Sequence, residues 1–297
     1  MSALHPTRGH SPLPFVILPA VPPNLVSRDV STRGVRIRVN QIGAGPPVLL
    51  LHGLFTSSLA FDDILSPLAQ SFHVVTVDLP AFGESEKPPP ARFAFSVESC
   101  SEVVADVIAA LGVGRCHLVG HAIGGSVALT LAAEHPEFVD HLVLVAPWIH
   151  PHPLPRLMRL VLLPVIGSFA FKQLLSRRTF RAFFHQHVYA PGHAVPPARI
   201  DRYYDALNSP PAREGAHAFL ASLLDTRPSI ARLARIKSPT LVVWGRSDAL
   251  LSPQAAPRIV RQIANARLEY VDSGHSPHEE APGEFVNVVD RFLVGRP

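Results

Sequence analysis

Short runs of apolar residues recur along most of the chain, separated by segments in which apolar residues repeat at helical spacing. The runs predict strands at residues 47–51, 73–77, 116–119, 141–145, 240–244 and 267–271, and the first three are expected to be buried. The helical pattern covers residues 58–70, 97–111, 125–133, 253–264 and 282–293. Two alternating segments, 25–30 and 35–42, flank a Thr-Arg-Gly turn and predict an antiparallel hairpin. This order predicts an α/β fold with a mostly parallel central sheet and helices on both faces.

The alternation of strands and helices stops at residue 148 and resumes at residue 230. The segment between these points is proline-punctuated, rich in Leu, Phe, Arg and His, and helical in pattern. Residues 1–24 are proline-rich and predict a loose arm. The chain therefore divides into an arm (1–24), a core (25–147 and 230–297) and a helical insertion (148–229).

Composition and charge narrow the class of protein. The 297 residues are 47% hydrophobic, which is enough for a sizeable core. The net charge of +4 is small, and no Lys/Arg block is interleaved with aromatic residues, so nucleic acid is not expected as a partner. No uninterrupted apolar stretch reaches about 18 residues, so no transmembrane helix is predicted.

The two cysteines, Cys100 and Cys116, argue against a disulfide framework. Such cysteine usage is typical of a reducing compartment, and we expect a cytoplasmic protein with Cys116 as an inert core thiol. The apolar residues 12–21 leave an exported or membrane-peripheral protein as the alternative, although their prolines make a weak signal peptide.

The segment from residue 115 to residue 134 combines a strand, a glycine-bounded turn and an Ala-rich helix. The turn reads Gly120-His121-Ala122-Ile123-Gly124, which is the nucleophile-elbow pattern G-x-S-x-G with alanine at its centre. A dinucleotide site is excluded by the glycine spacing and by the lack of an acidic residue about 20 positions later. An ordinary strand-to-helix turn with packing glycines is the alternative reading of this segment alone.

Four motifs in order resemble the α/β-hydrolase superfamily over residues 25–297. They are LLLHG at 49–53, DLPAFGES at 78–85, GHAIGG at 120–125, and WGRSDALLS at 244–252 with SGHSPHEEAP at 273–282. The resemblance implies the chain order nucleophile, acid, histidine, which places these roles at Ala122, Asp248 and His275. It also implies that the backbone N–H groups of Leu54 and Ile123 form an oxyanion site, and that residues 148–229 form a cap.

The resemblance further implies a small apolar substrate contacted by Phe55, His121 and Trp148. No cofactor and no metal are expected, because the paired histidines of the insertion have no Cys or carboxylate at zinc-site spacing. These histidines, expected to be solvated, are His150, His152, His185 and His187. The segment 154–178 is apolar with basic ends. We expect it to have one of three roles: to line an apolar pocket, to contact a lipid surface, or to pack on the core.

A methyl group cannot attack a carbonyl, so Ala122 separates the expected family activity from the activity of this chain. The activity expected with serine at position 122 is hydrolysis of an ester or related acyl bond. We expect that Ala122 arose by engineering or by natural loss, and that the chain with alanine binds its ligand but is poorly active. Four serines that could replace the missing hydroxyl lack the elbow geometry: Ser57, Ser58, Ser85 and Ser126. Two alternatives remain: a lyase, cyclase, isomerase or cofactor-free oxygenase that uses the His275–Asp248 dyad, and a non-catalytic ligand-binding protein. The sequence predicts no oligomeric state.

Overall fold

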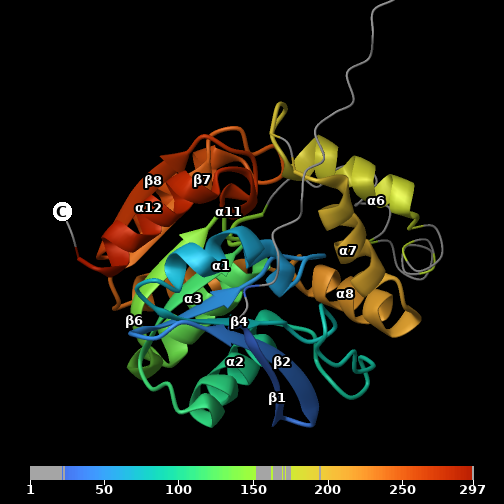
Figure 1. The fold of residues 1–297 in the computed structure, drawn as a ribbon, viewed down its shortest axis with the longest axis horizontal. Helices are drawn as coiled ribbons and strands as arrows, with labels where there is room; N and C mark the ends of the chain where they lie inside the picture. Colours follow the sequence, from blue (N-terminus) through green and yellow to red (C-terminus); the bar gives the residue numbers. More distant parts are fainter. Residues whose placement is uncertain are drawn as a thin grey trace, which may run out of the picture.

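The centre of the molecule is an eight-stranded sheet in the order β1-β2-β4-β3-β5-β6-β7-β8 (Figure 1). The computed structural model describes residues 22, 24–151, 162, 169, 171, 175–193 and 195–295. The strands are β1 (Val26–Thr32), β2 (Val35–Ile42), β3 (Pro47–Leu51), β4 (His73–Val77), β5 (Cys116–His121), β6 (Val139–Val145), β7 (Thr240–Gly245) and β8 (Ala266–Val271). Strand β2 is antiparallel to β1 and β4, and the pairs from β4 to β8 are parallel. The predicted fold class is confirmed.

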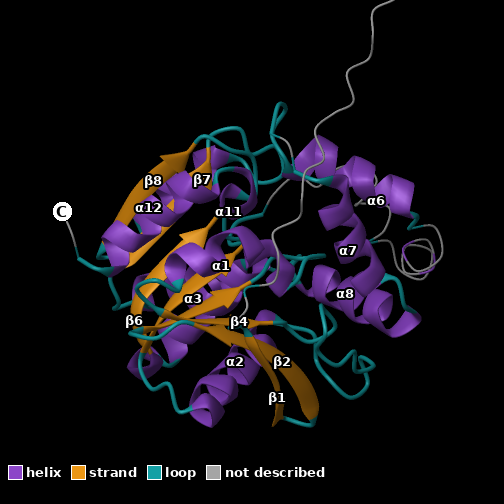
Figure 2. Cartoon of the chain, viewed as in Figure 1, coloured by secondary structure: helices purple, strands orange, loops and turns teal. Residues whose placement is uncertain are grey.

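Helices cover both faces of the sheet, as Figure 2 shows. The core helices are α1 (Asp62–Leu68), α2 (Val97–Leu111), α3 (Ile123–Glu134), α10 (Ala256–Val260), α11 (Pro277–Glu280) and α12 (Pro282–Leu293). In β3, Leu49 and Leu51 join the core that contains α2 and α3, whereas Val48 and Leu50 join the core that contains α1 and α12. This division follows from the two-residue alternation of a strand that is buried on both faces.

Two predicted helices are shorter and less regular than expected. Residues 58–70 form a 3-10 turn, η1 (Ser58–Phe61), before α1, and the Ser57 hydroxyl caps that turn by accepting from the Leu59 N–H. Residues 253–264 form η5 (Pro253–Ala255) and the short α10. Pro257 lies in the first turn of α10, the part of a helix that tolerates proline, so a regular helix cannot extend back to residue 253.

Between β6 and β7 the chain forms a group of helices to one side of the sheet (Figure 1). They are α6 (Arg177–Phe183), the π-helical turn η3 (Phe184–Val188), α7 (Pro197–Leu207), α8 (Pro210–Ser222), α9 (Arg227–Arg232) and η4 (Leu233–Arg235); a further 3-10 turn, η2 (Pro136–Phe138), precedes β6. The arm at 1–24 and the apolar segment at 154–178 lie almost entirely outside the described residues, so their predicted roles stay predictions. Among the described helices, none combines the length and hydropathy needed to cross a bilayer.

Both cysteines are free and buried in the core. Burial raises the pKa of the Cys116 thiol to about 12, so this thiol stays protonated at neutral pH. An unreactive role for Cys116 is consistent with this environment.

Candidate active site

Ala122 occupies a sharp turn between β5 and α3. Its backbone angles are φ 49° and ψ −110°, a region that residues with a Cβ rarely adopt and that costs on the order of 1–3 kcal/mol. The Ala122 N–H donates to the carbonyl of Val145 (2.9 Å), and the Ala122 carbonyl accepts from the N–H groups of Ser126 (3.2 Å) and Trp148 (3.1 Å). These bonds hold the strained turn in place.

The glycines on either side of the turn are required by close packing. A Cβ at Gly120 would lie 2.3 Å from the carbonyl oxygen of Gly124, and a Cβ at Gly124 would lie 2.3 Å from the carbonyl oxygen of Leu51. Both separations are shorter than any real Cβ contact. The glycine pattern therefore follows from the approach of α3 to the ends of β5 and β3.

Asp248 and His275 form a buried pair at the carboxyl ends of β7 and β8. The Nδ1 of His275 lies 2.8 Å from the Oδ2 of Asp248, and the side chains are 4% and 0% exposed. The Oδ1 of Asp248 accepts from the N–H groups of Leu250 (2.9 Å) and Leu251 (2.8 Å). Because these bonds fix the carboxylate, Asp248 holds the imidazole with its Nε2 available for proton transfer.

The backbone of His275 is anchored from two directions. Its N–H donates to the carbonyl of Val188 (2.7 Å) at the end of η3, and its carbonyl lies 3.0 Å from the Nε2 of His121. His121 was expected to contact substrate; it lines the pocket and also holds the loop that carries His275. The inserted segment and the elbow thus both position this loop.

A further buried histidine, His278, packs edge-on against His121. Ring centroids are 4.7 Å apart both for His121 with His275 and for His121 with His278. Burial lowers the pKa of His278 to about 3 and, together with the neighbouring imidazoles, lowers the pKa of His121 well below its ordinary value. Both side chains are therefore neutral at neutral pH, so they add no positive charge beside His275.

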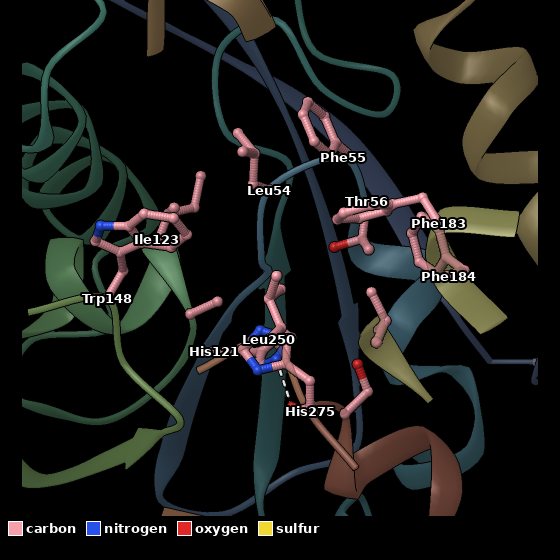
Figure 3. A pocket seen from close by; sticks show the side chains of 13 residues that line it. Leu54, Phe55, Thr56, His121, Ile123, Trp148, Phe183, Phe184, Leu250 and His275 are labelled. Carbon is pink, nitrogen blue, oxygen red and sulfur yellow. Dashed lines mark hydrogen bonds between the residues drawn. The ribbon is translucent and has the colours of Figure 1, made fainter. Parts of the chain in front are cut away.

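The pocket beside Ala122 is lined mainly by apolar side chains (Figure 3). The predicted site residues brought together there are Leu54, Phe55, His121, Ala122, Ile123, Trp148 and His275, and the pocket also contains Thr56, Phe183, Phe184, Val188, Leu250 and Ser276. Asp248 stands behind His275. Neither the Leu54 nor the Ile123 amide N–H donates a hydrogen bond to another described residue, so both remain available as oxyanion donors.

His52 supports the loop after β3. Its Nε2 accepts from the N–H of Leu79 (3.0 Å), and its Nδ1 lies 2.8 Å from the Gly53 carbonyl. An imidazole with a hydrogen on Nδ1 alone satisfies both bonds. Burial lowers the pKa of His52 and favours this neutral form.

A buried polar cluster joins the inserted segment to the core just after His278. The Glu279 carboxylate accepts from the hydroxyls of Tyr203 (2.6 Å) and Tyr189 (3.2 Å). Arg199 on α7 makes a bidentate ion pair with Asp63 on α1 (2.5 and 3.0 Å), and its Nη1 lies 3.8 Å from Glu279. These contacts fix α7 and the chain after η3 against the core.

The four serines considered as replacement nucleophiles are engaged elsewhere. The Ser126 hydroxyl donates to the Trp148 carbonyl (2.5 Å), and the Ser85 hydroxyl donates to the Asp78 carbonyl (2.6 Å). Ser57 accepts from the Leu59 N–H, and Ser58 accepts from the amide of Asn40. None of these four residues lines the pocket, and the pocket serine is instead Ser276, which sequence analysis did not consider.

The histidine pairs of the insertion are only partly described. His185 is exposed and His187 half-buried, whereas His152 lies outside the described residues. Within the described part of the chain, these histidines form no cluster of three metal-ligating side chains.

Several site residues carry no separate sequence signal. Phe183, Phe184 and Val188 reach the pocket through the folding of the insertion. His278 and Glu279 do have a signal, because they belong to the motif SGHSPHEEAP that contains His275.

Comparison with known proteins agrees with this geometry. The profile of the alpha/beta hydrolase fold matches residues 46–282. Haloalkane dehalogenase 2 of Mycobacterium tuberculosis is 29% identical over 272 residues, which are 88% of this chain and 93% of that protein. Pimeloyl-(acyl-carrier protein) methyl ester esterase of Aeromonas hydrophila is 28% identical over 263 residues, 86% of this chain and 99% of that protein.

Among solved structures, a hydrolase from Pseudomonas aeruginosa PA01 superposes with a TM-score of 0.77 at 26% identity, covering 91% of this chain and 98% of that one. The sheet order, the glycine-framed turn after β5 and the profile match lead to one conclusion: the chain belongs to the α/β hydrolase fold family.

Proposed function

We propose that this protein is an ester- or acyl-bond hydrolase scaffold for a small apolar compound, in which Ala122 stands at the nucleophile position. The observation that carries the proposal is the pocket that holds Ala122 and His275 together, with Asp248 bonded to the far nitrogen of His275. His275 as the base, Asp248 as its orienting acid and two amide donors are all in place, and the one group that the chain lacks is a hydroxyl at position 122.

With serine at position 122, each group has a defined task. His275 takes the hydroxyl proton on Nε2 while the serine oxygen attacks the carbonyl carbon, and it later returns the proton to the leaving group. Asp248 stabilises the imidazolium. The amides of Leu54 and Ile123 donate to the carbonyl oxygen as negative charge develops on it, and each such donor is worth about 3 kcal/mol.

With alanine at position 122, the chain binds substrate without forming an acyl intermediate. Removing the nucleophile of a serine protease lowers kcat by about a million-fold and leaves binding and oxyanion effects. The pocket wall favours an apolar ligand, since Leu54, Phe55, Trp148 and Phe183 line it. The relative named as a methyl ester esterase supports an acyl substrate, and the dehalogenase supports an apolar one.

The test is to replace Ala122 by serine and assay short p-nitrophenyl esters. The strained turn is already formed around a residue with a Cβ, so serine should adopt the same conformation, and we expect a rate several orders of magnitude above that of the unchanged chain. His275→Ala in the same Ala122→Ser background should abolish the gain. A folded Ala122→Ser protein that hydrolyses no ester across a range of acyl lengths would refute the proposal.

One observation favours a second candidate. The His275–Asp248 pair is complete and faces the pocket although no hydroxyl stands at position 122, as a lone general base would require. Such a base would serve a lyase, cyclase, isomerase or cofactor-free oxygenase. This candidate would be supported if the unchanged chain showed turnover and His275→Ala lost it. A binding protein would be indicated if no turnover were found and His275→Ala kept its affinity for the ligand.

A further inference from the structure

A cluster of two histidines and an aspartate lies at the opposite edge of the sheet from Ala122. His117 is the second residue of β5, and Asp140 and His141 are the second and third residues of β6. Parallel strands begin at this edge and end at the pocket edge, so the cluster takes no part in the site described above.

An irregularity in strand pairing brings the three side chains together. Cys116 pairs with Val139, but the next paired residues are Leu118 and Leu142. One residue of β5 therefore faces two residues of β6, as in a β-bulge. Bulges redirect side chains that would otherwise alternate between faces, and this one places His117 opposite both Asp140 and His141.

The distances within the cluster suit a small cation. The Oδ2 of Asp140 lies 3.5 Å from the Nδ1 of His117 and 3.2 Å from the Nδ1 of His141, and all three donor atoms lie within 4.8 Å of one another. Donors bound tetrahedrally to zinc at its usual bond lengths are about 3.3 Å apart. The two aspartate–histidine separations are close to that spacing.

The two imidazole nitrogens have no other use in the described structure. The Nδ1 atoms of His117 and His141 are both buried and make no hydrogen bond to described residues. His117 is only 6% exposed, so water does not readily solvate this nitrogen. A buried ring nitrogen that makes no hydrogen bond is costly, and a bound cation would remove that cost.

The surroundings fix the rings and leave one side open. Phe72 packs edge-on against the His117 ring, with ring centroids 6.0 Å apart, and Phe292 of α12 packs edge-on against the His141 ring, with ring centroids 5.3 Å apart. The Oδ1 of Asp140 faces the Arg115 guanidinium (3.6 Å), while its Oδ2 faces the imidazoles. Asp140 is 41% exposed at its side chain, so solvent can reach the cluster and complete the coordination of an ion.

We propose that His117, Asp140 and His141 bind a divalent transition-metal ion such as Zn²⁺ at the N-terminal edge of the sheet. Two imidazoles and one carboxylate form a ligand set that such ions prefer. The ion would join the starts of β5 and β6 and stabilise the fold rather than take part in hydrolysis.

The proposal is tested by titrating ZnCl₂ into the EDTA-treated, desalted full chain with isothermal calorimetry. We expect one Zn²⁺ per chain, together with a Zn²⁺-dependent rise in melting temperature. Asp140→Ala and His141→Ala remove side chains that are partly exposed, so both variants should fold. Loss of even an outer-shell partner weakens metal sites by about 10- to 100-fold, so each variant should bind Zn²⁺ at least tenfold more weakly.

The matched controls remove histidines elsewhere in the protein. His185→Ala/His187→Ala removes the histidine pair of η3, and His275→Ala removes the pocket histidine; both should bind Zn²⁺ as the unchanged chain does. The proposal is overturned if the unchanged chain binds no Zn²⁺, if Asp140→Ala and His141→Ala bind it undiminished, or if a control variant loses the binding instead.

Discussion

Replacement of Glu279 by glutamine should change how the stability of this protein depends on pH. The Glu279 carboxyl is buried among Tyr189, Tyr203 and Arg199. Burial raises its pKa from 4.5 to about 7, because a buried carboxylate loses its hydration, and the nearby Arg199 and Tyr203 offset only part of that cost. Glutamine keeps an oxygen that can accept from the tyrosine hydroxyls but cannot ionise.

The sign and size of the effect follow from the two pKa values. The folded protein holds the proton on Glu279 more tightly than the unfolded chain does. Its contribution to stability is therefore fully present below about pH 4.5 and is lost as the pH rises to about 7. A change in pKa from 4.5 to about 7 corresponds to about 3 kcal/mol. The variant should gain up to this amount relative to the unchanged protein across that interval.

The assay is urea unfolding of both proteins between about pH 4 and about pH 8, followed by tryptophan fluorescence. Subtracting one profile from the other removes the titration of all shared groups. Glu269→Gln, on the exposed side of β8, is the matched control and should leave the profile unchanged. If the free energies of unfolding of Glu279→Gln and the unchanged protein run parallel over the whole range, the reasoning about Glu279 is wrong.

Three further perturbations follow from the site. Gly124→Ala should lower the free energy of unfolding by about 3 kcal/mol or prevent folding, because its Cβ would lie 2.3 Å from the Leu51 carbonyl oxygen; a variant as stable as the parent in urea unfolding would contradict this contact. The unchanged chain should not react with a fluorophosphonate probe, since no hydroxyl stands at position 122; labelling of any serine, mapped by mass spectrometry, would show that another residue is the nucleophile. Phe183→Ser in the Ala122→Ser background should shift the preferred acyl length in an ester series, because Phe183 lines the pocket; an unchanged preference with only a lower melting temperature would assign Phe183 to packing.

The sheet is predictable from sequence because its inner strands are buried on both faces. Residues 47–51 are an uninterrupted apolar run and residues 73–77 are mostly apolar, and the two segments coincide with β3 and β4. The irregular start of the segment at 58–70 is not predictable in the same way. There the Ser58 N–H donates to the carboxylate of Asp78, twenty residues later, and local periodicity carries no information about such a bond.

The candidate site shows the same division. Asp248 and His275 are predictable because each follows a parallel strand whose carboxyl end must face the same edge of the sheet. The contact of Val188 with His275 is not, because it depends on how η3 folds over the core. The pairing irregularity that gathers His117, Asp140 and His141 likewise depends on register, which a single sequence does not specify at one-residue precision.

The hydrogen bond from the His275 N–H to the Val188 carbonyl has a consequence for the evolution of this protein. The insertion contributes side chains to the pocket and also supports the loop that carries the candidate base, His275. An exchange of residues 148–229 for the insertion of a relative would therefore alter more than the shape of the binding space. Unless the new segment offers a carbonyl at the place of Val188, the imidazole would lose one of its supports, so new specificity and retained proton transfer must be selected together.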